Sequence, residues 1–327
     1  MDDMIKMMEG LGGARLLEMY RAMLAIRHFE EQVRYLFLEG IMPGTIHQYD
    51  GQEACAVGVC EALIEGDIIG STHRPHGHAI ARGIELKAAM AELFGKKTGC
   101  CKGKGGSMHL GDLSRGMLPA VAIVGGNAPI VTGVALSFKM QKKPNVAISF
   151  VGDGAANEGA FHEAVNMASV YGLPALFVIE NNLYGASTRV SLASNVEDLS
   201  IRAGAYGIEG VSAFGNNVLE VYAAAKRLID KARGGGGPSI LELKTFRRCG
   251  HSRRDARLYI TKEDSDYWMP LDPIPIFADI LLKNGVADQG RLDKITEAVD
   301  SEIQEAVEYA KASPDPVPED TFSDFWV

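Results

Sequence analysis

The chain of 327 residues lacks the features that mark several classes of protein. No apolar run approaches the ~20 residues of a membrane-spanning helix, so we expect no membrane span. The net charge of −9 argues against a nucleic-acid-binding protein, which needs a basic face. Five cysteines, with no CxxC pair, argue against a disulfide framework and against a zinc site. An acidic start, MDDM, replaces the basic region of a signal peptide, so we expect a cytoplasmic protein.

What is present is the composition of an ordinary globular protein, with 46% hydrophobic and 23% charged residues. Strand-like and helix-like segments alternate, which predicts an α/β fold with a parallel sheet flanked by helices. No G-x-G-x-x-G motif follows a strand-like segment, so a nicotinamide site is not expected. Besides the segments discussed next, we predict strands at 68–71 and 239–246, a strand end with a helix at 121–138, and helices at 15–39, 51–63, 197–206, 218–233 and 292–310.

The most informative segment is GDGAANEGAFHEAVNMASVYGLPALFVIENN, which runs from Gly152 to Asn182. Buried-strand runs at 146–151 and 175–180 flank apolar residues at helical spacing, which predicts two parallel strands joined by a crossover helix. Asp153 follows the first strand and Asn182 the second. Their oxygens should therefore meet at one edge of the sheet, where carboxylate and amide ligands suit Mg²⁺ or Ca²⁺.

Small residues follow the first of these strands. Gly152, Gly154 and Ala155 leave backbone N–H groups open to an anion at the start of the crossover helix. The segment therefore predicts a site for a metal ion together with a phosphate group.

GDG followed at this distance by NN resembles the metal–diphosphate motif of enzymes that use thiamine diphosphate. AANEG and ENNLYG add a resemblance to the alpha subunits of the acetoin and pyruvate (2-oxo acid) dehydrogenase components. DGQEACAVG, STHRPHGHAIARG and GKGGSMH resemble the matching segments, so the resemblance covers about residues 42–272. It implies a thiamine-diphosphate-binding fold, thiamine diphosphate and Mg²⁺ as cofactors, and a small-molecule substrate. That substrate is acetoin, which is cleaved, or a 2-oxo acid such as pyruvate, which is decarboxylated; the acyl group passes to lipoamide.

The resemblance also implies a division of the chain and a set of metal ligands. Residues 46–265 form the domain that binds diphosphate and metal. Residues 1–45 form an N-terminal helical extension, and residues 266–327 form a C-terminal helical extension with an aromatic tail. The expected metal ligands are Asp153, Asn182 and the backbone carbonyl of Tyr184.

Further residues are assigned to the cofactor or to catalysis by the same resemblance. Arg74 follows a predicted strand, and its planar fork of donors suits a diphosphate. Its neighbour His73 stands where pyruvate-type relatives tend to have tyrosine and acetoin-type relatives often have histidine. His251, in the GHS segment, lies beside the cofactor and is expected to have a near-neutral pKa that suits proton transfer. His47 corresponds to a position near the substrate channel and is a second catalytic candidate, and the backbone at Val124 contacts the aminopyrimidine ring.

Three segments keep more than one interpretation. FRRCGHSRRDARLY holds five arginines and departs from the family pattern at Arg254 and Ala256; it fits an acidic lipoyl domain, an acidic substrate or a solvated basic loop. GKGGSMH suits a phosphate cradle, a wall of the substrate channel or a partner contact. The tail carries Phe322, Phe325 and Trp326, which predicts a subunit interface, a disordered tail being the alternative.

One requirement of thiamine chemistry is not found in the sequence. A carboxylate must contact the aminopyrimidine ring. In this enzyme class a separate pyrimidine-binding domain carries that carboxylate, and we find no room for such a domain in this sequence. We therefore expect a beta subunit that supplies the activating glutamate in an alpha-two beta-two heterotetramer, and an acyltransferase whose lipoyl domain accepts the acyl group. The alternatives are the N-terminal subunit of a split transketolase and a noncatalytic cofactor-binding paralogue.

Overall fold

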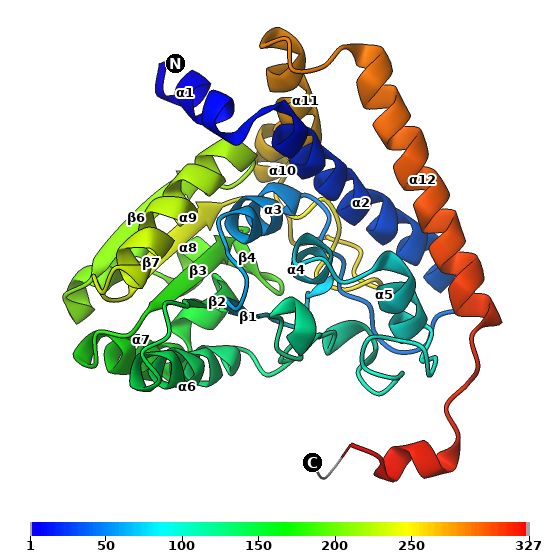
Figure 1. The fold of residues 1–327 in the computed structure, drawn as a ribbon, viewed down its shortest axis with the longest axis horizontal. Helices are drawn as coiled ribbons and strands as arrows, with labels where there is room; N and C mark the ends of the chain where they lie inside the picture. The colour runs from blue at the N-terminus through cyan, green and yellow to red at the C-terminus, as the bar shows by residue number, and fades with distance from the viewer. Residues whose placement is uncertain (1, 325–327) are drawn as a thin grey trace.

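The computed structural model describes residues 2–324, with side chains from residue 5 onward. Five strands form a parallel sheet in the order β1-β2-β3-β7-β6 (Figure 1). They are β1 (Ile68–Gly70), β2 (Ala147–Gly152), β3 (Ala175–Asn181), β7 (Ser239–Lys244) and β6 (Glu209–Phe214). β4 (Tyr184–Gly185) and β5 (Thr188–Arg189) form a separate antiparallel hairpin. The predicted α/β fold with a parallel sheet flanked by helices is confirmed.

The sheet is buried on both faces, which explains the continuous apolar runs of its central strands. Phe150 and Val178 pair in register and pack into one hydrophobic cluster, whereas Val151 and Ile179 pack into another. Neighbouring residues thus point to opposite faces, as the two-residue period of a strand requires. The helices that cover the two faces are α6 (Asn127–Met140) and α7 (Gly159–Val170) on one, and α3 (Glu53–Glu61) and α9 (Val218–Arg233) on the other (Figure 1).

Helices from both ends of the chain add a further layer outside α3. The long helix α12 (Gln289–Ala312) packs along α2 (Gly13–Leu38) and α5 (Leu86–Leu93) (Figure 1). The remaining helices are α1 (Asp2–Leu11), α4 (His76–Ala81), α8 (Val190–Ala193), α10 (Lys262–Trp268) and α11 (Pro273–Lys283). Within residues 2–324, none of the helices has both the length and the apolar content that crossing a membrane requires.

Some predicted elements differ from those observed. Residues 121–126 form no strand; Gly125, at φ +75°, lies in the turn before α6. The predicted helix at 197–206 is a 3-10 helix, η4 (Leu199–Tyr206). Sequence reasoning missed β6, because this edge strand is only partly buried and contains no continuous apolar run.

The C-terminal tail contacts a lysine-rich loop of the same chain. Its Asp320 accepts hydrogen bonds from Lys97 at 2.8 and 2.9 Å. Phe322 is exposed, and Phe325 and Trp326 lie outside the described residues. The subunit interface expected for this tail therefore stays a prediction.

Candidate active site

A cavity of about 420 Å³ opens at the carboxyl edge of the sheet, where ligands bind in open α/β folds. Segments that follow β1, β2, β3 and β7 line it, so residues far apart in sequence meet there. All the predicted site residues line this cavity: His47, His73, Arg74, Val124, Gly152, Asp153, Gly154, Ala155, Asn182, Tyr184 and His251.

Asp153 is a buried carboxylate without an ion-pair partner among the described residues. It lies directly after β2 and is 2% exposed. Burial raises the pKa of Asp153 to about 6, and Arg247 offsets only part of that effect. A divalent cation beside the Asp153 carboxylate would favour its ionised form and so lower this pKa. The environment of Asp153 therefore fits the predicted metal ligand.

The segment after β3 passes close to Asp153. The side-chain oxygen of Asn182 accepts a 3.4 Å hydrogen bond from the backbone N–H of Tyr184. A Cβ atom built on Gly185 would lie 3.1 Å from the Cα of Gly154 and 3.7 Å from Oδ2 of Asp153. The backbone of β4 therefore passes close to the carboxylate, and a side chain at position 185 would crowd this contact.

Two arginines supply the opposite charge. Arg74 is buried and donates hydrogen bonds to two backbone carbonyls, those of Gln48 and His251. Arg247 is also buried and donates to Ala186 O at 3.1 Å. Burial and the nearby Arg247 lower the pKa of Arg74 to about 10. Neither guanidinium has a carboxylate partner within the described part of the chain. An anion at this point would relieve the cost of two unpaired buried charges.

Arg247 was not among the predicted site residues, because it was grouped with the other arginines of a basic loop. It follows β7 at the same edge of the sheet where Arg74 follows β1. That position after a strand is the signal that distinguishes it from the arginines further along the loop.

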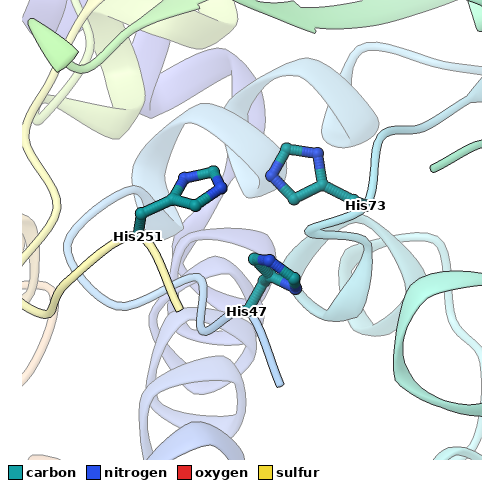
Figure 2. Close-up of side chains that lie close together, drawn as sticks. All are labelled: His47, His73 and His251. Atoms are coloured by element: carbon teal, nitrogen blue, oxygen red, sulfur yellow. The ribbon is translucent and has the colours of Figure 1, made fainter. Parts of the chain in front are cut away.

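Three histidines face one another across the cavity (Figure 2). The ring centroids of His47 and His73 are 4.8 Å apart, those of His47 and His251 5.1 Å, and those of His73 and His251 5.2 Å. Burial, followed by the charge of Arg74, lowers the pKa of His47 to about 3, of His73 to about 2 and of His251 to about 4. All three rings are therefore neutral at pH 7. The near-neutral pKa expected for His251 is wrong for the cofactor-free chain.

The predicted anion site does not lie at the N-terminus of an α-helix. Gly154 precedes a short 3-10 turn, η3 (Ala155–Asn157), and α7 begins only at Gly159. The backbone groups of Gly154 and Ala155 nevertheless line the cavity. Any hydrogen bond that these backbone N–H groups donate to an anion comes from a turn, so the dipole of α7 strengthens it little.

The phosphate cradle considered for GKGGSMH is wrong, because the same chain fills it. The carboxylate of Glu92 is fully buried and accepts four backbone N–H groups at 2.8–3.0 Å. The donors are Cys101, Gly103, Gly105 and Gly106. Only Met108 from the end of this loop reaches the cavity, so the loop forms part of its wall.

The sequence model of the family described as "dehydrogenase E1 component" matches residues 21–319. The chain belongs to this family. Membership implies thiamine diphosphate as the cofactor, in agreement with a cavity lined by a buried carboxylate and by two arginines that have no carboxylate partner within residues 2–324.

Members of this family with similar sequences include two acetoin:2,6-dichlorophenolindophenol oxidoreductase alpha subunits. The one from Bacillus subtilis is 46% identical over 96% of this chain and 94% of its own length. The one from Cupriavidus necator is 45% identical over 95% of this chain and 94% of its own length. The chloroplastic pyruvate dehydrogenase E1 component subunit alpha-3 of Arabidopsis thaliana is 38% identical over 92% of this chain and 72% of its own length. These matches do not favour a split transketolase or a noncatalytic paralogue.

Proposed function

We propose that this chain is the alpha subunit of a thiamine-diphosphate-dependent dehydrogenase that cleaves acetoin and passes the acyl group to lipoamide. The observation that carries the proposal is one cavity that holds the buried Asp153 together with Arg74 and Arg247, neither of which has a carboxylate partner among the described residues. Acetoin is preferred because the two relatives named for it, at 46% and 45% identity, are more similar than the 38% pyruvate-type relative. A 2-oxo acid such as pyruvate is the second candidate.

In this proposal the chain binds the metal and the diphosphate. Asp153, the side-chain oxygen of Asn182 and the carbonyl of Tyr184 would hold Mg²⁺, which favours hard oxygen ligands. The diphosphate would contact Arg74 and Arg247, with the amides of Gly154 and Ala155 and the ring of His251 as further contacts. The positive charge of Mg²⁺ matches Asp153, and the negative charge of the diphosphate matches Arg74 and Arg247.

Thiamine diphosphate, when bound, supplies the carbanion chemistry for cleaving a C–C bond beside a carbonyl. The contribution of this chain is position and proton transfer. Neutral His251 and His47 present ring nitrogens that can accept a proton. Negative charge on a bound diphosphate would raise the pKa of His251 towards neutrality, so proton transfer by this residue would depend on cofactor binding.

A partner subunit is supported by the surface around the cavity. Ile123 and Val124 line it, yet their side chains are 76% and 51% exposed, which is the kind of apolar surface that a partner covers. Of the three carboxylates in the lining, Asp153 is assigned to the metal and Glu180 is hydrogen-bonded to Tyr49, which leaves Glu158. We therefore propose a beta subunit that closes the cavity and supplies the activating glutamate, in an alpha-two beta-two assembly. The lipoyl domain of an acyltransferase would then approach over the arginine loop.

One experiment tests the whole proposal. The chain is purified alone and with its beta subunit, and binding of thiamine diphosphate with Mg²⁺ is measured by calorimetry. Turnover is then measured with acetoin, pyruvate and branched 2-oxo acids, with lipoamide as the acceptor. We expect turnover only in the complex, with acetoin the best substrate. Equal turnover by the chain alone would refute the division of labour, and binding without turnover in the complex would indicate a noncatalytic paralogue.

The remaining carboxylate in the lining, Glu158, provides a sharper test of the missing glutamate. A Glu158→Gln variant of the complex should still form product if the beta subunit supplies the activating carboxylate. Complete loss of turnover with intact cofactor binding would instead assign that role to Glu158.

A further inference from the structure

His47, His73 and His251 offer a second kind of chemistry in the same cavity, distinct from the oxygen ligands around Asp153. One ring nitrogen of each histidine lies within 4.8 Å of the corresponding nitrogens of the other two. His47 is 8% exposed, and its Nδ1 has no hydrogen-bond partner in the part of the chain that the structure describes. Nε2 of His73 is also buried, and it too finds no hydrogen-bond partner among the described residues. Two of the three rings therefore carry a buried polar atom whose hydrogen bond is not satisfied within the described chain, and such atoms need an explanation.

The spacing of the rings matches that of three imidazoles around one ion. Zn–N bonds of about 2.0–2.1 Å in a tetrahedral arrangement place imidazole centroids roughly 5 Å apart. The observed centroid distances are 4.8, 5.1 and 5.2 Å. Figure 2 shows the three rings gathered around one space, each supplied by a different segment of the chain. The cysteine spacing bears only on zinc sites built from thiolates. A histidine site is not visible in the sequence, because its three ligands are far apart along the chain.

We propose that His47, His73 and His251 bind a divalent transition-metal ion such as Zn²⁺, with the fourth coordination position open to the cavity. Three histidines with one open position form a known type of zinc site, and imidazole is a poor ligand for Mg²⁺ compared with oxygen. The site is therefore separate from the proposed Mg²⁺ site in ligand chemistry. An ion here would fill the space in front of the rings, so zinc would reversibly block the cavity.

Two contacts limit the affinity. Nδ1 of His251 lies 2.9 Å from Nη1 of Arg247, and this hydrogen bond must be lost if Nδ1 binds the ion or takes the ring proton. The guanidinium groups of Arg74 and Arg247 also repel a cation. We therefore expect a site of moderate affinity that a chelator empties, in contrast to a structural zinc.

Cobalt is the probe, because Co²⁺ replaces Zn²⁺ and reports its own geometry. The full-length chain is titrated with Co²⁺ and followed by visible absorption, and Zn²⁺ is then added as a competitor. We expect one equivalent of tetrahedral cobalt, seen as intense visible bands without the near-ultraviolet band of thiolate ligation. A purely octahedral spectrum would overturn the proposal. Binding with a thiolate band would also overturn it and would move the site to Cys100 and Cys101, which lie close to Glu92.

Variants then assign the ligands. His47→Asn, His73→Asn and His251→Asn should each weaken Co²⁺ binding at least about tenfold, because even outer-shell changes cost that much. His28→Asn is the control, since His28 contacts Asp300 on another surface and should leave binding unchanged. Unchanged affinity in all three cavity variants would overturn the proposal.

Two further measurements do not depend on how well those variants fold. Arg247→Gln should bind Co²⁺ more tightly, because a nearby positive charge is removed and Nδ1 of His251 is released; weaker binding would contradict the proposed position. X-ray absorption of the zinc-loaded wild-type chain should show three imidazole ligands, and fewer than three would refute the site.

Discussion

Replacing Asp153 with asparagine should stabilise the cofactor-free chain while it removes the proposed metal site. The folded chain raises the pKa of this carboxyl group from 3.8 to about 6, chiefly by burial. Between these two values the folded chain holds the proton and the unfolded chain does not, so stability falls as the pH rises through this window. The difference corresponds to about 3 kcal/mol of lost stability above pH 6. Asparagine carries no charge and avoids this cost.

The measurement is calorimetric melting of wild type and Asp153→Asn from pH 4 to pH 8. The variant should be more stable by up to about 3 kcal/mol at pH 8, or about 4 °C in melting temperature for a chain of this length. The difference should nearly vanish at pH 4, where the wild-type carboxyl group is largely protonated in the folded state. Mg²⁺ with thiamine diphosphate and the beta subunit should raise the melting temperature of wild type only.

Asp67→Asn is the matched control. Asp67 is equally buried, but its carboxylate is paired with Arg233 at 2.7 Å and accepts a hydrogen bond from Val146 N at 2.9 Å. Its replacement should lower stability, because Arg233 loses its partner. If Asp153→Asn melted below wild type at pH 8, or if its effect did not vary with pH, Asp153 would be a satisfied structural group and the metal-site reasoning would fail.

Four further outcomes follow from the same physical arguments. Arg74→Gln should weaken thiamine diphosphate binding by about 1.5–3 kcal/mol in calorimetric titration of the complex, the value of hydrogen bonds to a charged group. Glu92→Gln should leave some of four loop amides without an acceptor and lower stability by about 1–3 kcal/mol for each, seen as faster amide exchange at 101–106. Truncation after Ser313 removes exposed ion pairs such as that of Lys97 and should change the melting temperature little; loss of subunit assembly would instead support the tail interface. The cavity histidines have lowered pKa values in the folded chain, so these side chains are protonated at higher pH in the unfolded chain than in the folded one. The urea midpoint should therefore decrease as the pH is lowered from about 7 to about 5.

The crossover around β2 and β3 could be predicted because its signals are local. Two continuous apolar runs, helical spacing between them and polar residues directly after each strand are enough to bring Asp153 and Asn182 to one edge. The position of Arg74 after β1 is a signal of the same kind. Arg247 also follows a strand, but the neighbouring arginines of the same segment prevented it from being singled out.

Properties that depend on distant neighbours could not be predicted from the sequence. The near-neutral pKa expected for His251 failed because burial and two guanidinium groups, one of them 177 residues away in sequence, act on the ring together. The amides of the GKGGSMH segment appeared free to bind phosphate because nothing in that segment shows that Glu92 accepts their hydrogen bonds. Both errors come from long-range contacts, which local patterns do not contain.

The cavity is electrostatically costly when no ligand is present. Asp153 is ionised at neutral pH despite burial, and within residues 2–324 no carboxylate pairs with the buried Arg74 or Arg247. Such charges lower stability, and well-packed apolar residues would do better if stability alone mattered. A metal ion beside the carboxylate and a diphosphate beside the arginines would remove both costs at once, which links ligand affinity to folding free energy. The stabilising effect expected of Asp153→Asn therefore measures the burial cost that a metal ion bound beside the carboxylate would relieve in wild type.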